Sequence, residues 1–383
     1  MNRINEPRNV RSVNGQANKW LVLIETMGEQ MQLGEQQADQ TDAFVADNYT
    51  LLKQHRFFSA LIPAEFGGGD ATFSEMSDIL RVLAHHSSST ALALSMHQHL
   101  VAANVFKYKK GQDVNRFLQN VADNQPILIS TGARDWLESN GSMSRTEGGY
   151  LFSGVKQFAS QSAYGGVAVT SAPFEEADGQ WSVLHFPAPL ASEGISVIEN
   201  WEAMGMRGTG SHAIKFDNVF IPDSAIALSR PRGDYHGVWN VVLTVAMPLI
   251  MSVYVGIAQK AVQIVTEHVR GFAAPKPHQI SAVGALNNEL TIAEMALNDM
   301  LRINNNFDFV PTDACGHLIL TRKSVVAESV VSVVSQALDI VGGQAFYRQH
   351  ALEKLFRDAQ GARYHPIYKA DQHLFSGNYL LRQ

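Results

Sequence analysis

The spacing of apolar residues divides the chain into two helical parts that are separated by a part with short alternating runs. From about Trp20 to Asn120, apolar residues recur at helical spacing, with a break at Gly67–Gly69. From Ile127 to Pro222, short runs of alternating apolar and polar residues are separated by Gly and Pro turns, which is typical of strands. Helical spacing returns from about Gly237. The pattern predicts a mostly α protein with a central antiparallel β-domain.

The second helical part contains four long segments, which we predict as helices at Val241–Arg270, His278–Asn305, Asp313–Val341 and Phe346–Asp358. Four long helices in one unit are most simply a bundle. The chain has 383 residues, more than one ordinary domain of ~100–200 residues. We therefore predict three units: an N-terminal helical domain at 1–125, a middle β-domain at 126–225 and a C-terminal helical bundle at 226–383.

The most apolar stretch is Val241–Ala258, and its length of roughly 18 residues is at the lower limit for a membrane-spanning helix. It contains Pro248 and Tyr254, has no basic flank, and continues into the polar Gln259-Lys260. We therefore predict a helix that is buried in the bundle, and no membrane segment. Because an exposed apolar surface of this size would be a liability, we also expect subunit contacts that form a homotetramer or homodimer.

Charge and cysteine content narrow the function classes. The net charge of −6 is mild, and the sequence has no basic patch that would suggest binding to nucleic acid or to an anionic membrane. The single cysteine, Cys315, excludes an internal disulfide and any metal site built on several cysteines, so we expect a buried structural thiol. The first 40 residues lack the apolar core and cleavage site of a signal peptide. These features predict a cytoplasmic protein.

A glycine-rich turn followed by a strand is predicted at Asn200–Pro222. Gly205, Gly208 and Gly210 lie where the backbone needs positive φ or a close approach, and alternation follows from Ala213. Pro222 then ends the strand because proline cannot donate to a ladder.

Four stretches in order resemble the acyl-CoA dehydrogenase superfamily. The turn Met204–Arg207 and the strand Phe216–Pro222 are similar to the family's Met-Gly-x-Arg and Phe-Asp-x-Val-x-(Ile/Val)-Pro. The other three resemblances lie at Ile62–Gly68, at Gly149–Ser160, and at Gly342-Gly343 with Leu352–Asp358. The resemblance covers about residues 45 to 370 and implies an N-terminal helical domain, a β-barrel-like middle domain and a C-terminal four-helix bundle.

The resemblance implies that the chain binds FAD between the β-domain and the bundle. An isoalloxazine ring needs an aromatic wall and short polar side chains at its edge. The residues that match the family's flavin contacts are Ser130, Thr131, Phe158, Ala159, Ser160, Arg270, Gly342 and Gly343. The family's acidic Thr-Glu-Pro and Gly-Ser-Asp elements are replaced by Thr131–Asp135, and Arg270 lies one residue closer to Phe272 than the family's arginine does. Gly342 after a helix also predicts a left-handed helix stop.

The catalytic glutamate of many acyl-CoA dehydrogenases is absent. The matching Tyr-Glu-Gly turn is His365-Pro366-Ile367 here, and the position used by other members falls near Ala246. His365, with an unperturbed pKa of ~6.5, can exchange a proton near neutrality. A histidine at this position resembles the two-component flavin monooxygenases of the same fold, in which it helps to deprotonate a phenol or amine.

A second candidate, His97, lies with His99 on a helix for which Ser87–Thr90 supply an N-cap. Side chains at i and i+2 point roughly 200° apart on a helix, so joint ligation of a metal is not expected. We expect one of the two to be exposed and the other to face a cleft. We retain His97 because related flavin monooxygenases carry a histidine near the end of the equivalent helix.

These observations leave three possible functions, of which the first two act on a small-molecule substrate. The first is dehydrogenation of an acyl-CoA with hydride transfer to FAD, for which an electron-transfer flavoprotein would be the partner. The second is a monooxygenase that uses O2 and reduced flavin from a flavin reductase, with FMN as the alternative cofactor. The third is an inactive flavin-binding protein. The resemblance also implies that such bundles associate into a dimer of dimers.

Overall fold

The computed structural model describes residues 18–132 and 137–381. Its N-terminal helices are α1 (Lys19–Thr41), α2 (Ala46–Gln54), α3 (Phe73–His86), α4 (Ser88–Lys109) and α5 (Asn115–Asn124). Helix α3 starts with a capping box in which Thr72 and Glu75 satisfy each other's backbone amides. Helix α4 starts after Ser87, whose side chain accepts a hydrogen bond from the Thr90 amide, so the predicted N-cap is confirmed.

The middle part forms one eight-stranded sheet, in the order β6-β7-β3-β2-β4-β5-β8 with β1 beside β4. The strands are β1 (Leu128–Ser130), β2 (Ser142–Thr146), β3 (Gly149–Lys156), β4 (Val167–Glu175), β5 (Trp181–Pro189), β6 (Ile195–Ile198), β7 (Ala213–Pro222) and β8 (Leu228–Pro231). Most pairs are antiparallel, as predicted, whereas β1 and β2 run parallel to β4. Phe152, Phe186 and Phe216 pack together in the core of this sheet.

The predicted turn and strand at Asn200–Pro222 is confirmed. Strand β7 pairs with β3, with Gly149 opposite Pro222. The turn before it contains a short 3-10 helix, Arg207–Thr209. Gly210 has φ 50°, and a Cβ on Gly205 would lie 2.4 Å from the Arg357 carbonyl oxygen. These two glycines therefore serve the two purposes that the sequence suggested, a positive φ and a close approach.

The C-terminal helices are α6 (Val238–Arg270), α7 (Pro277–Asn304), α8 (Asp313–Val341), α9 (Ala351–Ala359) and α10 (Lys369–Leu381). The first three lie within a few residues of their predicted bounds. The predicted helix Phe346–Asp358 starts later, because Gly342–Phe346 is a 3-10 segment and His350 caps α9. Gly342 has positive φ, but its ψ is −154°. The residue is therefore not in the left-handed helical conformation, and the predicted left-handed helix stop is wrong.

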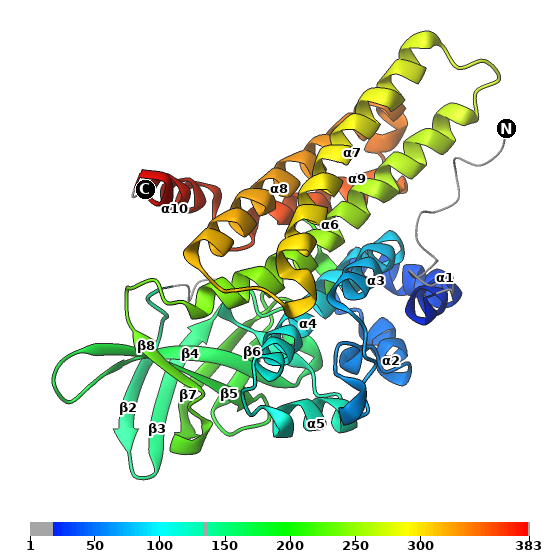
Figure 1. The fold of residues 1–383 in the computed structure, drawn as a ribbon. Helices are drawn as coiled ribbons and strands as arrows, with labels where there is room; N and C mark the ends of the chain where they lie inside the picture. Colours follow the sequence, from blue (N-terminus) through cyan, green and yellow to red (C-terminus); the bar gives the residue numbers. More distant parts are fainter. Residues whose placement is uncertain (1–17, 133–136, 382–383) are drawn as a thin grey trace.

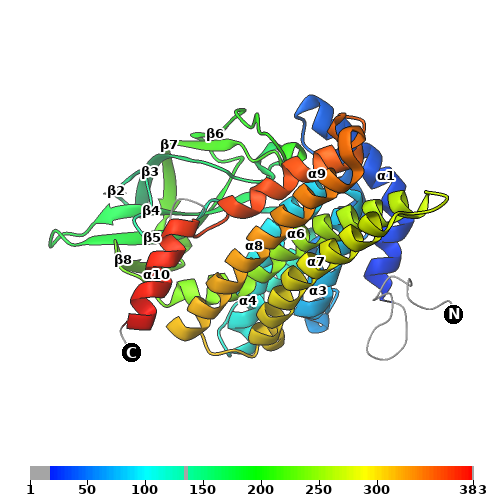
Figure 2. The same ribbon diagram turned by 90° about the horizontal axis from the view of Figure 1, so that it is seen from above.

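Helix α6 runs through the centre of the molecule, with α3 and α4 on one side and α7 and α8 on the other (Figures 1 and 2). Two described segments, α6 and Asp313–Phe346, are long and apolar enough to cross a membrane. In α6, however, 89% of the most apolar window is buried inside the protein. The sequence pattern had singled out only the first of these two segments. Cys315 on α8 is buried, as expected, with its Sγ 3.2 Å from Thr244 Oγ1 on α6.

Candidate active site

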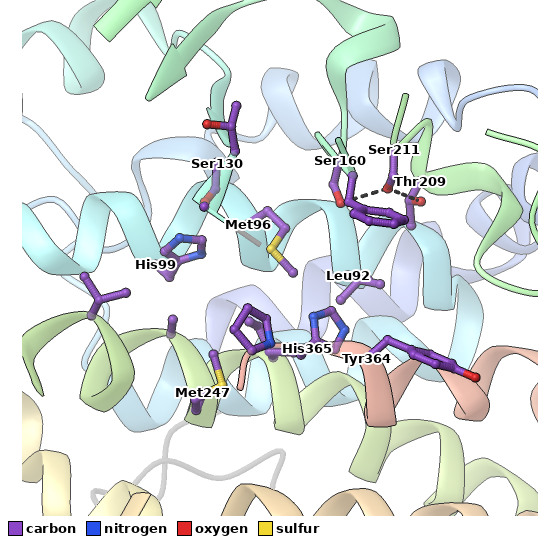
Figure 3. Close-up of a pocket in the computed structure, with 18 of the residues that line it drawn as sticks. Leu92, Met96, His99, Ser130, Ser160, Thr209, Ser211, Met247, Tyr364 and His365 are labelled. Carbon is purple, nitrogen blue, oxygen red and sulfur yellow. Dashed lines mark hydrogen bonds between the residues drawn. The ribbon is translucent and has the colours of Figure 1, made fainter. Parts of the chain in front are cut away.

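A cavity of about 560 Å³ lies between the β-domain, α4, α6 and the segment after α9. Figure 3 shows Ser160 and Ser211 on one side of it and Met247 and His365 on the other. Its helical walls are mostly apolar and consist of Leu92, Met96, His99, Leu100 and Ala103 of α4 and Val238, Trp239, Val242, Leu243, Val245, Ala246, Met247, Ile250 and Tyr254 of α6. A concave, largely apolar site with few polar groups is typical of a small-molecule or cofactor site.

His365 and Tyr254 form a hydrogen-bonded pair in the wall of this cavity. The Tyr254 hydroxyl lies 2.7 Å from His365 Nε2. Gly361 makes room for the pair, since a Cβ at that position would lie 2.6 Å from the Tyr254 hydroxyl. Burial raises the pKa of Tyr254 well above its usual value, so the phenol keeps its proton. Depending on which partner donates, the free nitrogen of His365 is a donor or an acceptor.

The pKa of His365 is lowered to about 3, mainly by burial and also by the nearby Lys323 and His99. Lys323 is itself buried, and its Nζ donates to the Ile367 carbonyl oxygen at 3.2 Å. Burial lowers the pKa of this lysine to about 8. His365 is therefore a neutral imidazole at physiological pH, and the ordinary histidine pKa assumed from the sequence does not hold here.

His99 lines the cavity, whereas the candidate residue His97 does not. His97 Nε2 donates to the Phe58 carbonyl oxygen at 2.8 Å, and its Nδ1 accepts from the Leu128 amide at 3.1 Å. The two ring nitrogens of His97 thus join α4 to the 3-10 segment Phe57–Ser59 and to β1, and His97 does not line the cavity. His99 does line it, while its Nδ1 donates to the Ser95 carbonyl oxygen at 3.3 Å. Both histidines are buried, so the expectation that one is exposed was wrong.

The β-domain wall contains four of the five flavin-contact candidates from that domain: Ser130, Thr131, Phe158 and Ser160. Phe158 has φ 59°, is 43% exposed, and has its ring edge-on to Trp201 with 6.3 Å between the ring centroids. The Thr131 hydroxyl donates to Thr170 Oγ1 at 2.8 Å. The wall thus offers an aromatic face and short hydroxyl side chains in one place.

The Ser160 hydroxyl belongs to a chain of buried hydroxyl groups. Ser160 Oγ lies 2.8 Å from Ser211 Oγ, which lies 2.7 Å from Thr209 Oγ1 (Figure 3). Thr209 Oγ1 donates in turn to the Met206 carbonyl oxygen at 2.8 Å. The chain therefore connects the cavity to the turn before β7.

The remaining flavin-contact candidates do not line the cavity of this chain. Ala159 is buried, and its amide donates to the His212 carbonyl oxygen at 3.0 Å. Arg270 ends α6, about 24 Å along the helix axis from Tyr254 at a rise of about 1.5 Å per residue. Gly342 and Gly343 are exposed at the end of α8. The chain by itself therefore brings together only the β-domain candidates and His365.

A buried ion-pair cluster holds one end of the cavity. Lys354 on α9 pairs with Glu35 of α1 and with Asp358, and these two carboxylates are 5% and 0% exposed. Asp358 Oδ1 also accepts from the Met206 amide at 2.6 Å. Burial raises the pKa of Glu35, but the charge of Lys354 and the hydrogen bonds from Lys354, Ser87 and Ser89 together lower it below its usual value. The cluster thus fixes the turn before β7 against α1 and α9.

Arg357 extends this cluster to the cavity wall. Its guanidinium contacts Asp39 at 2.7 Å and Glu353 at 2.7 Å, and it donates to the Met204 carbonyl oxygen at 3.0 Å. Because both carboxylates already bind it, its charge is neutralised by the protein. Arg357 therefore supports the wall more than it offers a free cation to a ligand.

No described residue that lines the cavity is an Asp or a Glu. Its titratable bases are His99, His185 and His365, and burial lowers the pKa of each, to about 4, 4 and 3. His185 Nε2 also accepts from Arg230 Nε at 3.1 Å. The described walls are therefore neutral and hydrogen-bonding, without the carboxylate base that removal of an α proton from a thioester requires.

Sequence reasoning did not assign Tyr254, His99 or Trp201 to the site. The signal for Tyr254 was present, because a tyrosine within the most apolar stretch of the chain needs a hydrogen-bond partner when buried. No local pattern could identify that partner, because His365 is 111 residues away.

Residues 25–125 match the family described as acyl-CoA dehydrogenase, N-terminal domain. The chain is 24% identical over 371 residues to the putative acyl-CoA dehydrogenase YdbM of Bacillus subtilis (strain 168), which covers 92% of this chain and 94% of that protein. It is 25% identical over 354 residues to L-evernosamine nitrososynthase of a Micromonospora species, covering 86% and 82%. It is 22% identical over 369 residues to dibenzothiophene monooxygenase of Mycolicibacterium goodii, covering 87% and 86%.

Two solved structures superimpose over nearly the whole chain. A nitrososynthase from Micromonospora carbonacea var. africana has a TM-score of 0.85 at 22% identity, covering 94% of this chain and 95% of that one. KijD3 in complex with FMN and dTDP-3-amino-2,3,6-trideoxy-4-keto-3-methyl-D-glucose has a TM-score of 0.84 at 23% identity, covering 95% and 94%. These similarities confirm the predicted fold class.

Proposed function

We propose that the chain is a flavin-dependent monooxygenase of the acyl-CoA dehydrogenase superfamily and that it uses reduced flavin and O2. The observation that carries this proposal is the composition of the cavity. Three neutral histidines, His99, His185 and His365, line it, and none of the described lining residues is a carboxylate. Similar chains include a nitrososynthase and a dibenzothiophene monooxygenase, which supports oxidation by O2 over dehydrogenation.

In the proposed reaction one atom of O2 enters the substrate, the other is reduced to water, and the two electrons and two protons come from the reduced flavin. The protein binds the substrate against α4 and α6 and excludes water with their apolar side chains. The pair of His365 and Tyr254 holds an acidic proton of the substrate, such as that of a phenol or amine. A neutral imidazole suits this task because its two nitrogens can receive and pass on a proton. The expected substrate is a small, largely apolar molecule with one or two hydrogen-bonding groups.

The β-domain wall has the features that an isoalloxazine ring requires. Phe158 and Trp201 supply aromatic surface, and Ser130 and Ser160 supply short polar groups at its edge. KijD3 is similar to this chain and was solved with FMN, and XiaF, also similar, was solved with FADH2. We propose that either FAD or FMN binds here, supplied in reduced form by a separate flavin reductase.

The monooxygenase proposal is tested by product formation. The purified protein is mixed with an NADH-driven flavin reductase, FMN or FAD, isotopically labelled O2 and a panel of apolar phenols and amines. One labelled oxygen atom in a product is the expected result. Products that form without the protein, or none from any member of the panel, would contradict the proposal.

Dehydrogenation of an acyl-CoA is the second candidate, favoured by the similarity to YdbM over nearly the whole chain. The test is to mix the oxidised flavin complex anaerobically with acyl-CoAs of several chain lengths. Bleaching of the flavin without any reductase would support dehydrogenation. If neither experiment gives product or bleaching, the inactive flavin-binding protein becomes the best remaining description.

Replacing Phe158 by alanine is expected to weaken flavin binding by about tenfold, because an aromatic contact contributes about 0.5–1.5 kcal/mol beyond its buried area. The matched control is Phe220→Ala on β7, a phenylalanine that is 52% exposed and lies outside the cavity. Flavin fluorescence titration measures both dissociation constants. Equal affinities of the two variants would remove Phe158 from the flavin site.

We also propose that the chain forms a homodimer or homotetramer. Large apolar side chains are exposed near the end of α8 and on α10: Phe346 is 89% exposed, Tyr347 71%, Leu374 65% and Leu381 86%. Such surface is expected to be covered by other subunits. Light scattering across a wide concentration range should give a dimer or tetramer, and Phe346→Asp should shift it to smaller species. A stable monomer at all concentrations would contradict this proposal.

A further inference from the structure

The hydroxyl chain behind Ser160 has a fixed direction, which follows from the Met206 carbonyl group at its far end. A carbonyl oxygen only accepts, so the 2.8 Å contact between Thr209 Oγ1 and this oxygen is favourable only with the Thr209 proton between them. The indole Nε1 of Trp201 also donates to the same oxygen at 3.1 Å. The far end of the chain is therefore an acceptor.

Each hydroxyl has one proton, so the direction propagates along the chain. Thr209 has used its proton, and the 2.7 Å contact with Ser211 must contain the proton of Ser211. Ser211 has then used its own proton, so the 2.8 Å contact with Ser160 must contain the proton of Ser160. All three side chains are buried, and no further partner of their hydroxyl groups is observed among the described residues. Ser160 thus presents only acceptor lone pairs to the cavity.

An acceptor that faces N5 of a bound flavin discriminates between the two redox states of the ring. In the oxidised ring N5 only accepts hydrogen bonds, whereas two-electron reduction adds a proton to N5 and makes it a donor. An acceptor facing an acceptor in a buried site leaves both groups unsatisfied, at about 1–3 kcal/mol. Ser160 would therefore complement the reduced ring and oppose the oxidised one.

We propose that a flavin binds with N5 toward Ser160 and that this hydroxyl chain, by making Ser160 an acceptor, selects the reduced form, with Ser211 and Thr209 as the positioning residues that set its direction. The inference rests on the proposed function, since it requires that a flavin binds in this cavity. It goes beyond that function in assigning the redox preference to two residues that are not adjacent to Ser160 in the sequence. The Met206 amide, held by Asp358 at 2.6 Å, ties the end of the chain to the ion-pair cluster.

The test compares the dissociation constants of FMN and of dithionite-reduced FMN under anaerobic conditions by calorimetry. The wild-type protein is expected to bind reduced FMN at least about tenfold more tightly. Such a ratio raises the two-electron midpoint potential of the bound flavin by about 30 mV. Thr209→Val removes the acceptor for the Ser211 proton, and Ser211→Ala removes the acceptor for the Ser160 proton. Either variant should lower the ratio about tenfold, because Ser160 can then donate to the cavity.

Two further variants separate direction from structure. Thr209→Ser keeps the hydroxyl and should keep the wild-type ratio. Thr266→Val removes a hydroxyl that donates to the Val262 carbonyl oxygen at 2.7 Å, in the part of α6 outside the cavity, and should also leave the ratio unchanged. Thermal unfolding shows whether each variant is folded. If Thr209→Val does not fold, Ser211→Ala tests the same prediction.

The outcomes distinguish this inference from the function on which it rests. If the wild-type protein binds neither form of FMN nor of FAD, the flavin proposal itself fails. If both forms bind and their ratio is the same in Thr209→Val, Ser211→Ala and the wild type, the flavin proposal stands and the direction of the chain has no effect. A wild-type preference for oxidised flavin would also overturn the inference.

Discussion

Replacing His365 by alanine is expected to slow turnover by about 10²- to 10⁴-fold while flavin binding survives, because loss of a positioned proton-transfer group has this effect and the ring contacts lie in the β-domain. Tyr254→Phe removes only the hydroxyl that lies 2.7 Å from His365 Nε2. It should therefore give a smaller loss, in kcat more than in KM. The measurement is steady-state turnover with reductase, flavin and O2 on the substrate found in the panel.

The pH dependence provides an independent check on His365. Burial lowers its pKa to about 3, so it stays neutral from pH 8 down to about pH 5. Titration of His365 should therefore cause no inflection in the wild-type rate near pH ~6.5, the ordinary pKa of a histidine. A Lys323→Met variant removes one nearby positive charge and should raise the pKa of His365, moving an acid limb toward neutral pH. Near-full turnover in His365→Ala would contradict the assignment and make His99 the next residue to test.

Lys354→Met is expected to lower the free energy of unfolding by about 3–5 kcal/mol, because it leaves two buried carboxylates without their cation. Asp358→Asn should have a smaller effect, because Lys354 keeps its pair with Glu35. Lys354 lies between Glu35 and Asp358, and both carboxylates are buried. The Met206 amide would also lose part of its anchor in Asp358→Asn. Chemical denaturation measures the effect, and flavin affinity should fall with it because this cluster holds the turn before β7.

The matched control is Lys369→Met, which breaks the pair with Glu328, whose side chains are 63% and 49% exposed. Exposed pairs contribute about 0–1 kcal/mol, so this variant should be close to wild type. The pKa of Glu35 is lowered below its usual 4.5, so its stabilising contribution is present above that pH and is lost as the pH falls below it. Equal stabilities of Lys354→Met and Lys369→Met would show that the cluster does not stabilise the fold.

Local chemistry determined much of the architecture. The apolar spacing of α6, α7 and α8 placed these helices to within a few residues, because hydrophobic periodicity acts over one or two turns. Helix α9 was misplaced at its start because Gly342–Phe346 continues in 3-10 geometry, which the apolar spacing does not distinguish from an α-helix. The ordered motifs predicted the fold class, which the similar solved structures confirm.

Only the tertiary structure decided which side chains form the site. On α4 consecutive residues such as Ala91, Leu92 and Ala93 are all buried, so the helix has no exposed face against which to orient His97 and His99. Tyr254 and His365 are 111 residues apart, Ser160 and Ser211 are 51, and Glu35 and Lys354 are 319. Pairs at such separations are brought together by the packing of whole elements, whereas sequence periodicity reports only which face of one element is apolar. The sequence by itself therefore determined most of the helices and strands and the fold class, and the packing of the β-domain against α4 and α6 decided the hydrogen-bonding groups of the cavity.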